Sequence, residues 1–573
     1  MTVNKKNIIK LLETIAIYME LKGENTFKVS AFRKAANALE TDDRSLNEID
    51  SFTAINGIGK GTAAVIEEYI SDGKSSVLEE LQKEVPEGLV PLLKLPGLGG
   101  KKIAKLYQEL DVTNMEDLKN VCEAGKVSTL SGFGKKTEEK ILAAIENAGS
   151  QPERLPIAYM LPVAEKIEEA LSGMKGIKEF SRAGSLRRMR ETVKDLDFII
   201  AVEDVQAVKE QIMNLPDIKE SSAAGDTKIS LIFRYEWEVS VDFRLVKPDE
   251  YATALHHFTG SKDHNVRMRQ IAKDRGEKIS EYGVENAETG EMTTFRSEEE
   301  FFDHFGLPWI PPELREDGRE IEHYSKDYGL IELKDIKGDL HMHSTWTDGA
   351  YSLEEMIEAC RKKGYKYMAF TDHSQYLKVA NGLTAERLLK QRDEIRKLND
   401  KYDDITILSG IEMDILPDGT LDYEDEVLEQ MDLVIASIHS SFSQSREKIM
   451  ERMKTALKNA HVDIIAHPTG RIIGQREGYD VDVDMLIELA KETGTALELN
   501  ANPNRLDLSS ENIKKAVEAG VRIVINTDAH SIDHLEFMEV GVGAARKGWV
   551  TADSVINTYD SDGLLKFLKR NDG

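Results

Sequence analysis

Apolar residues follow different spacings along the chain, and each spacing predicts a different kind of structure. Over residues 1–150 they recur every three or four positions, which is the period of amphipathic helices. Residues 152–315 mix strand-like and helix-like stretches. From residue 338 onward, short apolar runs alternate with helical patterns, which predicts a parallel α/β sheet. Residues 316–337 are polar and highly charged, and we interpret them as a linker between two halves.

Three segments of the helical region repeat one glycine-containing pattern. They span residues 55–70, 95–110 and 130–146, and each has Gly-x-Gly, a polar or basic pair and then an amphipathic helix. The glycines permit a tight turn, and the amides that follow them open a helix N-terminus where a phosphate can bind. The segments resemble helix-hairpin-helix motifs, which hold DNA by its backbone without reading its sequence. The residues predicted to contact DNA are Gly57, Gly59, Lys60, Gly97, Gly99, Lys101, Gly132, Gly134 and Lys135.

Two predicted strands in the middle region carry three aspartates. Asp195 and Asp197 lie two residues apart on the first strand, so their side chains share one face. The second strand, residues 237–246, supplies Asp242. Neighbouring carboxylates repel one another unless a divalent cation joins them, and three from two strands suit two-metal phosphoryl transfer. We therefore predict that these aspartates bind Mg²⁺ or Mn²⁺.

The order of motifs over residues 1–315 resembles the DNA polymerase X family, the group of DNA polymerase beta. The shared features are the hairpins, a GS-x-RR segment, Asp-x-Asp, one later aspartate and an FTGS segment. The resemblance implies an 8-kDa-like helical domain at 1–90, a fingers-like region at 91–150, a nucleotidyltransferase palm at 151–250 and a thumb at 251–315. It also implies that the three aspartates are catalytic. The implied nucleotide contacts are Gly184, Ser185 and Arg188 for the triphosphate, His257, Phe258, Gly260 and Asn265 for the sugar and base, and Arg269 on the template side.

Two positions depart from that family's pattern. The sugar-gating tyrosine is replaced by His257, which puts discrimination against ribonucleotides in question. The lyase lysine of the beta-type N-terminal domain is replaced by Val65, and a valine cannot form a Schiff base. Lys28 and Lys34 lie nearby in sequence, but we do not assign them that chemistry. The sequence therefore argues against deoxyribose-phosphate lyase activity by the beta mechanism.

The C-terminal region, residues 338–573, contains seven short apolar runs, most of which end in a residue that can bind a metal. Strands that alternate with helices in this number suggest closure into a distorted β/α barrel. In such barrels the functional groups sit at the C-terminal ends of the strands. The residues at these positions that can bind a metal are His341, His343, Asp372, His373, Glu412, His439, His467, Asn500, Asp528 and His530, and Asp348 follows the first run.

These motifs resemble the PHP domain, named for polymerase and histidinol phosphatase, over about residues 336–573. The resemblance implies three metals, held by His341, His343, Glu412 and Asp528, by Glu412, His439 and His467, and by Asp348, His373 and His530. Zn²⁺, Mn²⁺ and Fe²⁺ suit such ligands about equally. The implied chemistry is hydrolysis of a phosphodiester by metal-activated water. Asn500 and Arg471 are weaker candidates for substrate contacts, and Asp372 for orienting a ligand.

Composition changes this picture in two respects. The net charge of −28 argues against a protein that coats DNA through bulk basicity, although the first 150 residues are nearly neutral. No apolar stretch is long enough for a membrane span, and the start of the chain alternates charged with apolar residues, unlike a signal peptide. Cys122 and Cys360 lie far apart, which suits a reducing compartment. We expect a cytoplasmic, nucleoid-associated monomer.

Together the two halves resemble the bacterial members of the DNA polymerase X family. The resemblance implies a polymerase that fills short gaps in base excision repair, with gapped or primed DNA and dNTPs as partners. It also implies a 3′–5′ exonuclease, with a further AP endonuclease activity, in the PHP domain. Two other interpretations stay open. The PHP domain could act on a small phosphomonoester, or the chain could be a DNA-binding scaffold without catalysis.

Overall fold

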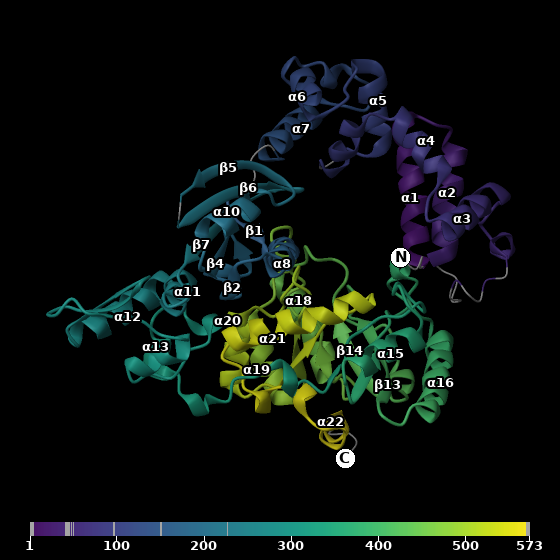
Figure 1. The fold of residues 1–573 in the computed structure, drawn as a ribbon. Helices are drawn as coiled ribbons and strands as arrows, with labels where there is room; N and C mark the ends of the chain where they lie inside the picture. Colours follow the sequence, from purple (N-terminus) through teal and green to yellow (C-terminus); the bar gives the residue numbers. More distant parts are fainter. Residues whose placement is uncertain are drawn as a thin grey trace.

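The computed structural model describes residues 5–40, 46, 49, 51–95, 98–148, 152–225 and 227–568. The N-terminal region is helical, as its apolar spacing predicts, with Leu12, Ile15 and Leu106 buried in a shared core. In Figure 1 its helices form an arc that begins beside the C-terminal domain and leads back to the central sheet. The helices are α1 (Lys5–Lys22), α2 (Thr26–Glu40), α3 (Lys60–Asp72), α4 (Ser76–Glu84), α5 (Gly100–Leu110), α6 (Met115–Glu123) and α7 (Lys135–Ala148).

The region predicted as the palm, called the palm below, is a mixed sheet whose described strands follow the order β2-β4-β7-β6-β5. β4 and β7 are parallel neighbours, and the other pairs are antiparallel. On β4, Phe198 and Ile200 face the core that includes α8 and α10, whereas Ile199 and Ala201 pack with α11. The elements are β1 (Leu155–Pro156), α8 (Ile157–Ser172), β2 (Ile177–Arg182), α9 (Gly184–Arg187), β3 (Thr192–Val193), β4 (Asp195–Val202), α10 (Val205–Met213), β5 (Ile218–Ala224), β6 (Lys228–Arg234) and β7 (Glu238–Val246).

The thumb packs around a cluster of phenylalanines. Phe301 and Phe302 are fully buried with Met268 and Phe295. Three short strands form a small antiparallel sheet beside these helices in the described part of the thumb. The elements are α11 (Tyr251–Thr259), α12 (Lys262–Asp274), β8 (Glu277–Ser280), β9 (Gly283–Asn286), β10 (Met292–Thr293), α13 (Glu298–His304) and α14 (Glu320–His323).

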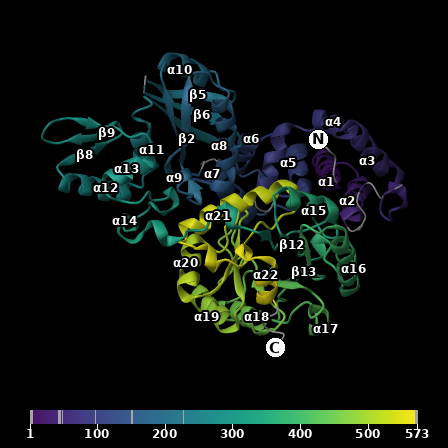
Figure 2. The same cartoon turned by 60° about the horizontal axis from the view of Figure 1, so that its bottom comes forward.

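The C-terminal domain is a nearly closed barrel. Within residues 338–568, all of which the structure describes, seven parallel strands follow sequence order, and a Met342–Ala529 bridge joins the segments after the first and last strands. Figure 2 shows the helices arranged around these strands. The strands are β11 (Gly338–Asp339), β12 (Tyr367–Phe370), β13 (Thr406–Asp414), β14 (Leu433–Ser437), β15 (Ile464–Ile465), β16 (Ala496–Asn500) and β17 (Ile523–Asn526). The helices are α15 (Leu353–Lys362), α16 (Ala385–Lys401), α17 (Asp425–Leu428), α18 (Arg446–Lys458), α19 (Val483–Thr493), α20 (Ser510–Ala519), α21 (Phe537–Lys547) and α22 (Ser561–Leu568). The predicted multidomain fold, with a helical N-terminal region and a C-terminal barrel, is confirmed.

The palm and thumb rest on the barrel through an extensive junction. One hydrophobic cluster runs from the palm into the barrel, so the two parts pack directly. Residues 316–337 contribute to this packing, because Ile321, Ile331 and Ile336 are buried and Ile331 N donates to Val550 O at 3.0 Å. Among the described helices, none combines the length and the apolar content that crossing a bilayer requires.

Candidate functional site

The three aspartates of the palm lie together on two adjacent parallel strands, two at the start of β4 and one in the middle of β7. Asp197 on β4 is in direct register with Asp242 on the adjacent β7, and Asp195 shares the face of Asp197. Burial, together with the charges of Asp195 and Asp242, raises the pKa of Asp197 to about 7. Such mutual repulsion is what a bound divalent cation relieves, so the donor set fits the predicted metals. Asp242 is also held by Lys228 Nζ at 2.7 Å and Ser230 Oγ at 2.5 Å.

Gly184 opens the short helix α9 next to these carboxylates. Its φ of +60° favours glycine, and an added Cβ would lie 2.3 Å from Asp197 Oδ2. The predicted phosphate loop therefore has a glycine at this position because the Asp197 carboxylate lies too close for a larger side chain. Ser185 follows it and is partly exposed at the start of α9.

The nucleotide residues predicted in the thumb gather around the end of α11. Asn265 Nδ2 donates to the carbonyl of His257 at 2.8 Å, which ties α12 to α11. The guanidinium of Arg244 lies 3.7 Å from the centre of the Phe258 ring. Gly260 has a φ of +68°, and a Cβ there would lie 3.3 Å from Arg188 Nη1. Arg269 is exposed on α12, and its charge acts on His257.

Each described Gly-x-Gly segment ends at the start of a helix. Gly59 and Gly99 are the N-caps of α3 and α5, and Gly134 directly precedes α7. A Cβ at any of these three glycines would meet no heavy atom within 4 Å, so the backbone is open to a close approach. Gly57 and Gly132 have positive φ. Lys60, Lys101 and Lys135 are exposed beside the turns, and Gly97 lies outside the described residues.

Val65 belongs to the helical core. It lies on α3 with 5% of its surface exposed, in the same cluster as Ile66 and Ala35. Lys28 pairs with Glu24 at 3.1 Å, and Lys34 is exposed. A core valine is thus found where the resemblance would require a reactive lysine.

The nine predicted ligands of the barrel converge at the C-terminal ends of its strands. Among the described residues searched, eight of them fall into three overlapping groups in which the ligand atoms lie within 4.8 Å of one another, and the ninth, His467, lies 2.8 Å from Glu412 Oε1. The groups are His343, Asp348, His373 and His530; His341, His343 and Asp528; and His373, Glu412 and His439. The grouping overlaps with the three sets implied by the resemblance, but His343 and His373 each belong to two groups here.

Glu412 is the centre of this cluster. Its Oε2 lies 2.8 Å from His373 Nδ1, and its Oε1 lies 2.8 Å from His467 Nε2 and 3.2 Å from His439 Nε2. His341 and His343 approach Oε2 at 3.5 and 3.6 Å. A single buried carboxylate therefore links ligands from both sides of the barrel mouth.

The charges in the cluster depend closely on one another. Burial by itself would raise the pKa of Glu412, but His439, His373 and His341 hold it well below its ordinary value. Burial lowers the pKa of His439, but Glu412 and Asp414 raise it more strongly, to about 10. Several buried atoms make no hydrogen bond within the described chain: His341 Nε2, His373 Nδ1, Glu412 Oε2 and Asp348 Oδ1. Converging donor atoms without hydrogen bonds fit divalent cations.

Two acids behind the histidines were missed by the sequence reasoning. Glu498 accepts a hydrogen bond from His341 Nδ1 at 2.6 Å and from His467 N at 2.7 Å. Asp414 lies 3.2 Å from His439 Nδ1. The sequence did contain a signal for both acids. Glu498 precedes Asn500 by two residues, and Asp414 follows Glu412 by two residues. Residues two apart on a strand share a face, so both acids could have been expected beside the candidate residues.

Three weaker candidates have structural contacts instead. Asp372 accepts hydrogen bonds from Ser344 N and Gln391 Nε2 rather than from a predicted ligand. Asn500 donates to Asp528 Oδ2 at 3.0 Å. Arg471 forms a two-point ion pair with Glu191 of the palm, at 2.7 and 3.1 Å. Since its guanidinium is engaged there, Arg471 joins the two halves in this structure.

The opening of the metal cluster faces the N-terminal domain. Asp348 and His530 have side chains 31% and 20% exposed, whereas His341, His343 and Glu412 are fully buried. A cavity of about 420 Å³ lies between Asp348 and α1. It is lined by Lys5, Ile9, Lys10, Glu13, Thr345, Thr347, Asp348 and Gly349.

Comparison with known protein families finds a separate match for several regions of the chain. Family models match the chain as DNA polymerase beta thumb over residues 254–316, helix-hairpin-helix domain over 3–75, SAM-like helix-hairpin-helix tandem over 89–147, and PHP domain over 339–502.

Similar proteins cover either nearly the whole chain or about 40% of it. A probable phosphatase of Thermoanaerobacter sp. (strain X514) is 31% identical over 242 residues, which are 40% of this chain and 94% of the phosphatase. The DNA polymerase/3′-5′ exonuclease PolX of Bacillus subtilis (strain 168) is 66% identical over 569 residues, covering 99% of this chain and all of that protein. With helix-hairpin-helix motifs, a beta-type thumb and a PHP barrel in one chain, and this identity along its whole length, the protein belongs to the PolX family of DNA polymerases.

Proposed function

We propose that the protein is a template-directed DNA polymerase that fills short gaps during base excision repair and carries a metal-dependent 3′–5′ exonuclease in its PHP domain. The observation that carries the proposal is the presence of two separate ligand sets in one PolX-family chain. Three carboxylates lie in the palm, and nine ligand-type residues lie in the barrel. The substrates are gapped or primed DNA and dNTPs. We place the protein in the cytoplasm, associated with the nucleoid, as a monomer.

At the polymerase site, Asp195, Asp197 and Asp242 would hold two divalent cations. Mg²⁺ or Mn²⁺ supplies, when bound, the positive charge that favours attack by a primer 3′ hydroxyl and stabilises the departing pyrophosphate. Asp197 must lose its proton for this role, and its pKa is raised by burial and by the charges of the two neighbouring aspartates. Gly184, Ser185 and Arg188 hold the triphosphate. His257, Phe258, Gly260 and Asn265 line the sugar and base, and Arg269 contacts the template.

The hairpin glycines supply sequence-independent contact with DNA. Gly59, Gly99 and Gly134 leave the following helix N-termini open, so that phosphates can approach backbone amides directly. The exposed Lys60, Lys101 and Lys135 add charge near the same phosphates. This mode of binding suits a chain with a net charge of −28, because it needs only local positive charge.

In the PHP domain, the nine converging residues would hold up to three cations, with Zn²⁺, Mn²⁺ or Fe²⁺ as the suitable ions. Such cations supply activation of water for hydrolysis of a phosphodiester. Glu498 and Asp414 keep the rings of His341 and His439 in place. The substrate is the 3′ end of a DNA strand, and cleavage at an abasic site is a second reaction of the same class.

A specific observation favours a second candidate for the PHP domain. The probable phosphatase of Thermoanaerobacter is similar to this chain over 94% of its own length, a stretch of 242 residues that is about as long as this domain. A small phosphomonoester could therefore be hydrolysed at the same cluster. Release of inorganic phosphate from a monoester, without degradation of DNA, would favour this candidate over the exonuclease.

The decisive experiment follows one labelled primer on gapped DNA. Asp195→Ala/Asp197→Ala should abolish extension and keep degradation, whereas His341→Ala/His343→Ala should do the reverse. Glu203→Ala and His461→Ala are matched controls, since they remove an exposed acid and a histidine outside both clusters. If either double variant loses both activities while its control keeps them, two independent sites cannot be correct.

A further inference from the structure

The loop that carries Arg188 is supported from the PHP side of the junction. Met189, the next residue, has a φ of 53°, and its side chain faces Gly543 of α21. A Cβ at Gly543 would lie 3.0 Å from two atoms of Met189, so the helix and the loop are in close contact. Arg188 and Arg190 therefore extend from a loop that rests on the PHP domain.

Glu316, at the end of the thumb, joins this loop to the PHP domain. Its Oε1 accepts from Arg188 Nε at 3.3 Å and from Lys547 Nζ of α21 at 2.6 Å, and its Oε2 accepts from Arg190 Nη1 at 3.3 Å. Lys547 also donates to the main-chain oxygen of Arg188 at 3.3 Å. The side chains of Arg188 and Lys547 are each 14% exposed, so water screens these contacts poorly.

These contacts fix the orientation of the Arg188 guanidinium. Nη1 donates to the carbonyl of Thr259 at the start of the thumb, and Nε donates to Glu316. Because the guanidinium is planar, two bonds at different nitrogens set its plane. Among the described residues, Nη2 has no hydrogen-bond partner, which leaves one nitrogen to bind a phosphate oxygen.

We propose that Glu316 and Lys547 are positioning residues of the polymerase site, through which the PHP domain supports nucleotide binding in the other half of the molecule. Lys547 holds Glu316 in place, and Glu316 holds Arg188 ready for the triphosphate. The inference rests on the assignment of Arg188 to the triphosphate under Proposed function. In the opposite arrangement, Glu316 would compete with the triphosphate for Arg188, and its removal would tighten nucleotide binding.

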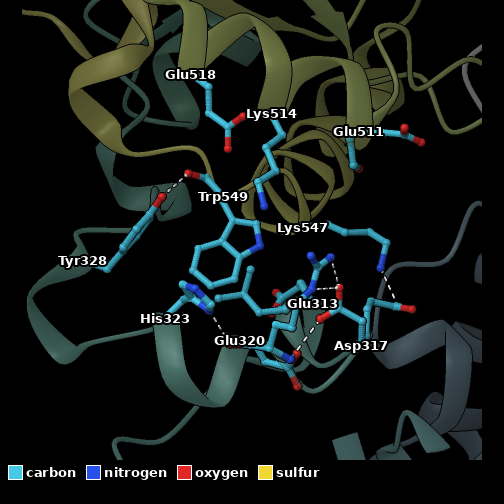
Figure 3. A pocket seen from close by; sticks show the side chains of 14 residues that line it. Glu313, Asp317, Glu320, His323, Tyr328, Glu511, Lys514, Glu518, Lys547 and Trp549 are labelled. Carbon is cyan, nitrogen blue, oxygen red and sulfur yellow. Dashed lines mark hydrogen bonds and ion pairs between the residues drawn. The ribbon is translucent and has the colours of Figure 1, made fainter. Parts of the chain in front are cut away.

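A second ion pair crosses the same junction and provides a matched control. Arg546, the neighbour of Lys547 on α21, pairs with Glu313 at 3.0 Å, and both side chains are similarly shielded, at 16% and 17% exposure. Glu313 and Lys547 line a cavity of about 520 Å³ at the junction. Figure 3 shows Trp549 inside this cavity, between Tyr328 and Lys514. Arg546 supports the same interface through Glu313 and the carbonyl of Ile331, and among the described residues it forms no hydrogen bond with Arg188.

The test measures single-nucleotide gap filling by the full chain across a series of dNTP concentrations. Arg188→Ala should raise the KM for dNTP roughly 10- to 100-fold, the loss expected for a charge-assisted hydrogen bond. Glu316→Gln should raise it about 3- to 30-fold, and Lys547→Met by a smaller factor in the same direction. Lys547→Arg should restore most of the loss, while Arg546→Gln should change the KM less than about twofold. The Kd for gapped DNA should stay unchanged in all of these variants.

An unchanged or lowered KM in Glu316→Gln would overturn the inference. An equal rise in Arg546→Gln and Lys547→Met would do the same, because it would indicate general loosening of the junction. If Lys547→Met does not fold, as judged by thermal melting, Glu316→Gln decides the question from the other side. If Arg188→Ala also leaves the KM unchanged, the assignment of Arg188 to the triphosphate fails as well. A rise in Arg188→Ala alone rejects only the inference.

Discussion

The polymerase site and the PHP site hold their charges in different ways. In the palm, three acids lie on two adjacent strands, and burial together with the charges of Asp195 and Asp242 raises the pKa of Asp197. In the barrel, histidines surround Glu412 and lower its pKa against the effect of burial. The ligand-type residues of the palm site are all acids. Those of the barrel site also include histidines, whose imidazole rings can take up protons and so balance the acids.

The difference indicates how each site depends on cations. Oxygen ligands alone suit Mg²⁺, which keeps part of its water and exchanges with the substrate phosphates. Buried imidazoles backed by Glu498 and Asp414 suit a more tightly held Zn²⁺, Mn²⁺ or Fe²⁺. We therefore expect the palm to receive cations together with a nucleotide, and the barrel to keep them between reactions.

Metal removal tests this contrast with the largest expected effect. Protein treated with EDTA and transferred to metal-free buffer should lose both activities. Addition of Mg²⁺ should restore primer extension fully but not degradation, which should return only with Zn²⁺, Mn²⁺ or Fe²⁺. Labelled primer products on gels report both activities in one reaction. Equal recovery of both with Mg²⁺ would contradict the proposed difference between the sites.

Glu412→Gln should remove the link between the two sides of the barrel site. The carboxylate lies within 3.6 Å of His341, His343, His373, His439 and His467. We expect degradation to fall by more than the roughly 100-fold that loss of an outer contact can cause. Extension should change less than twofold. Asp418→Asn, an exposed acid beyond the same strand, is the control and should leave degradation unchanged.

Gly184→Ala disturbs the palm site without removing a ligand. The new methyl group would lie 2.3 Å from Asp197 Oδ2 at a φ of +60°, so the carboxylate or the loop has to shift. A displacement of about 1 Å in a phosphoryl-transfer site can cost on the order of 100-fold in rate. Single-turnover extension should fall by about that factor, with degradation unchanged. Gly173→Ala, near the end of α8, provides a glycine control with more space around it.

The sequence indicated which ligand-type residues lie close together, because strand geometry constrains them. Asp195 and Asp197 had to share a face, and residues at the ends of parallel strands had to meet at one edge of the barrel. The position of Val65 in a helical core also follows from its spacing on an amphipathic helix. Contacts between distant segments were not predictable in this way. The pairing of Arg471 with Glu191 depends on how two domains pack, and no local pattern encodes that arrangement.

Glu498 illustrates the same limit inside one domain. It lies on β16 beside Asn500, and the periodicity shows which side of the strand it faces, but not which of the two polar side chains reaches a histidine. In the structure its Oε1 accepts from His341 Nδ1 at 2.6 Å and from Asn526 Nδ2 at 3.1 Å. The carboxylate thereby fixes the proton on Nδ1 and leaves His341 Nε2 directed at Glu412 and Asp528.

Glu498→Gln should therefore weaken the barrel site while keeping its ligands. The neutral amide keeps the size of the side chain but loses the charge that orients His341, and such changes lower metal affinity or activity about 10- to 100-fold. Degradation should fall accordingly and recover in part as the metal concentration rises, because the ligands themselves are intact. Glu488→Gln, at an exposed position on α19, should have no effect. A loss that added metal does not reduce would indicate that Glu498 acts on folding or substrate instead, and the barrel would then resemble the palm in relying on its direct ligands alone.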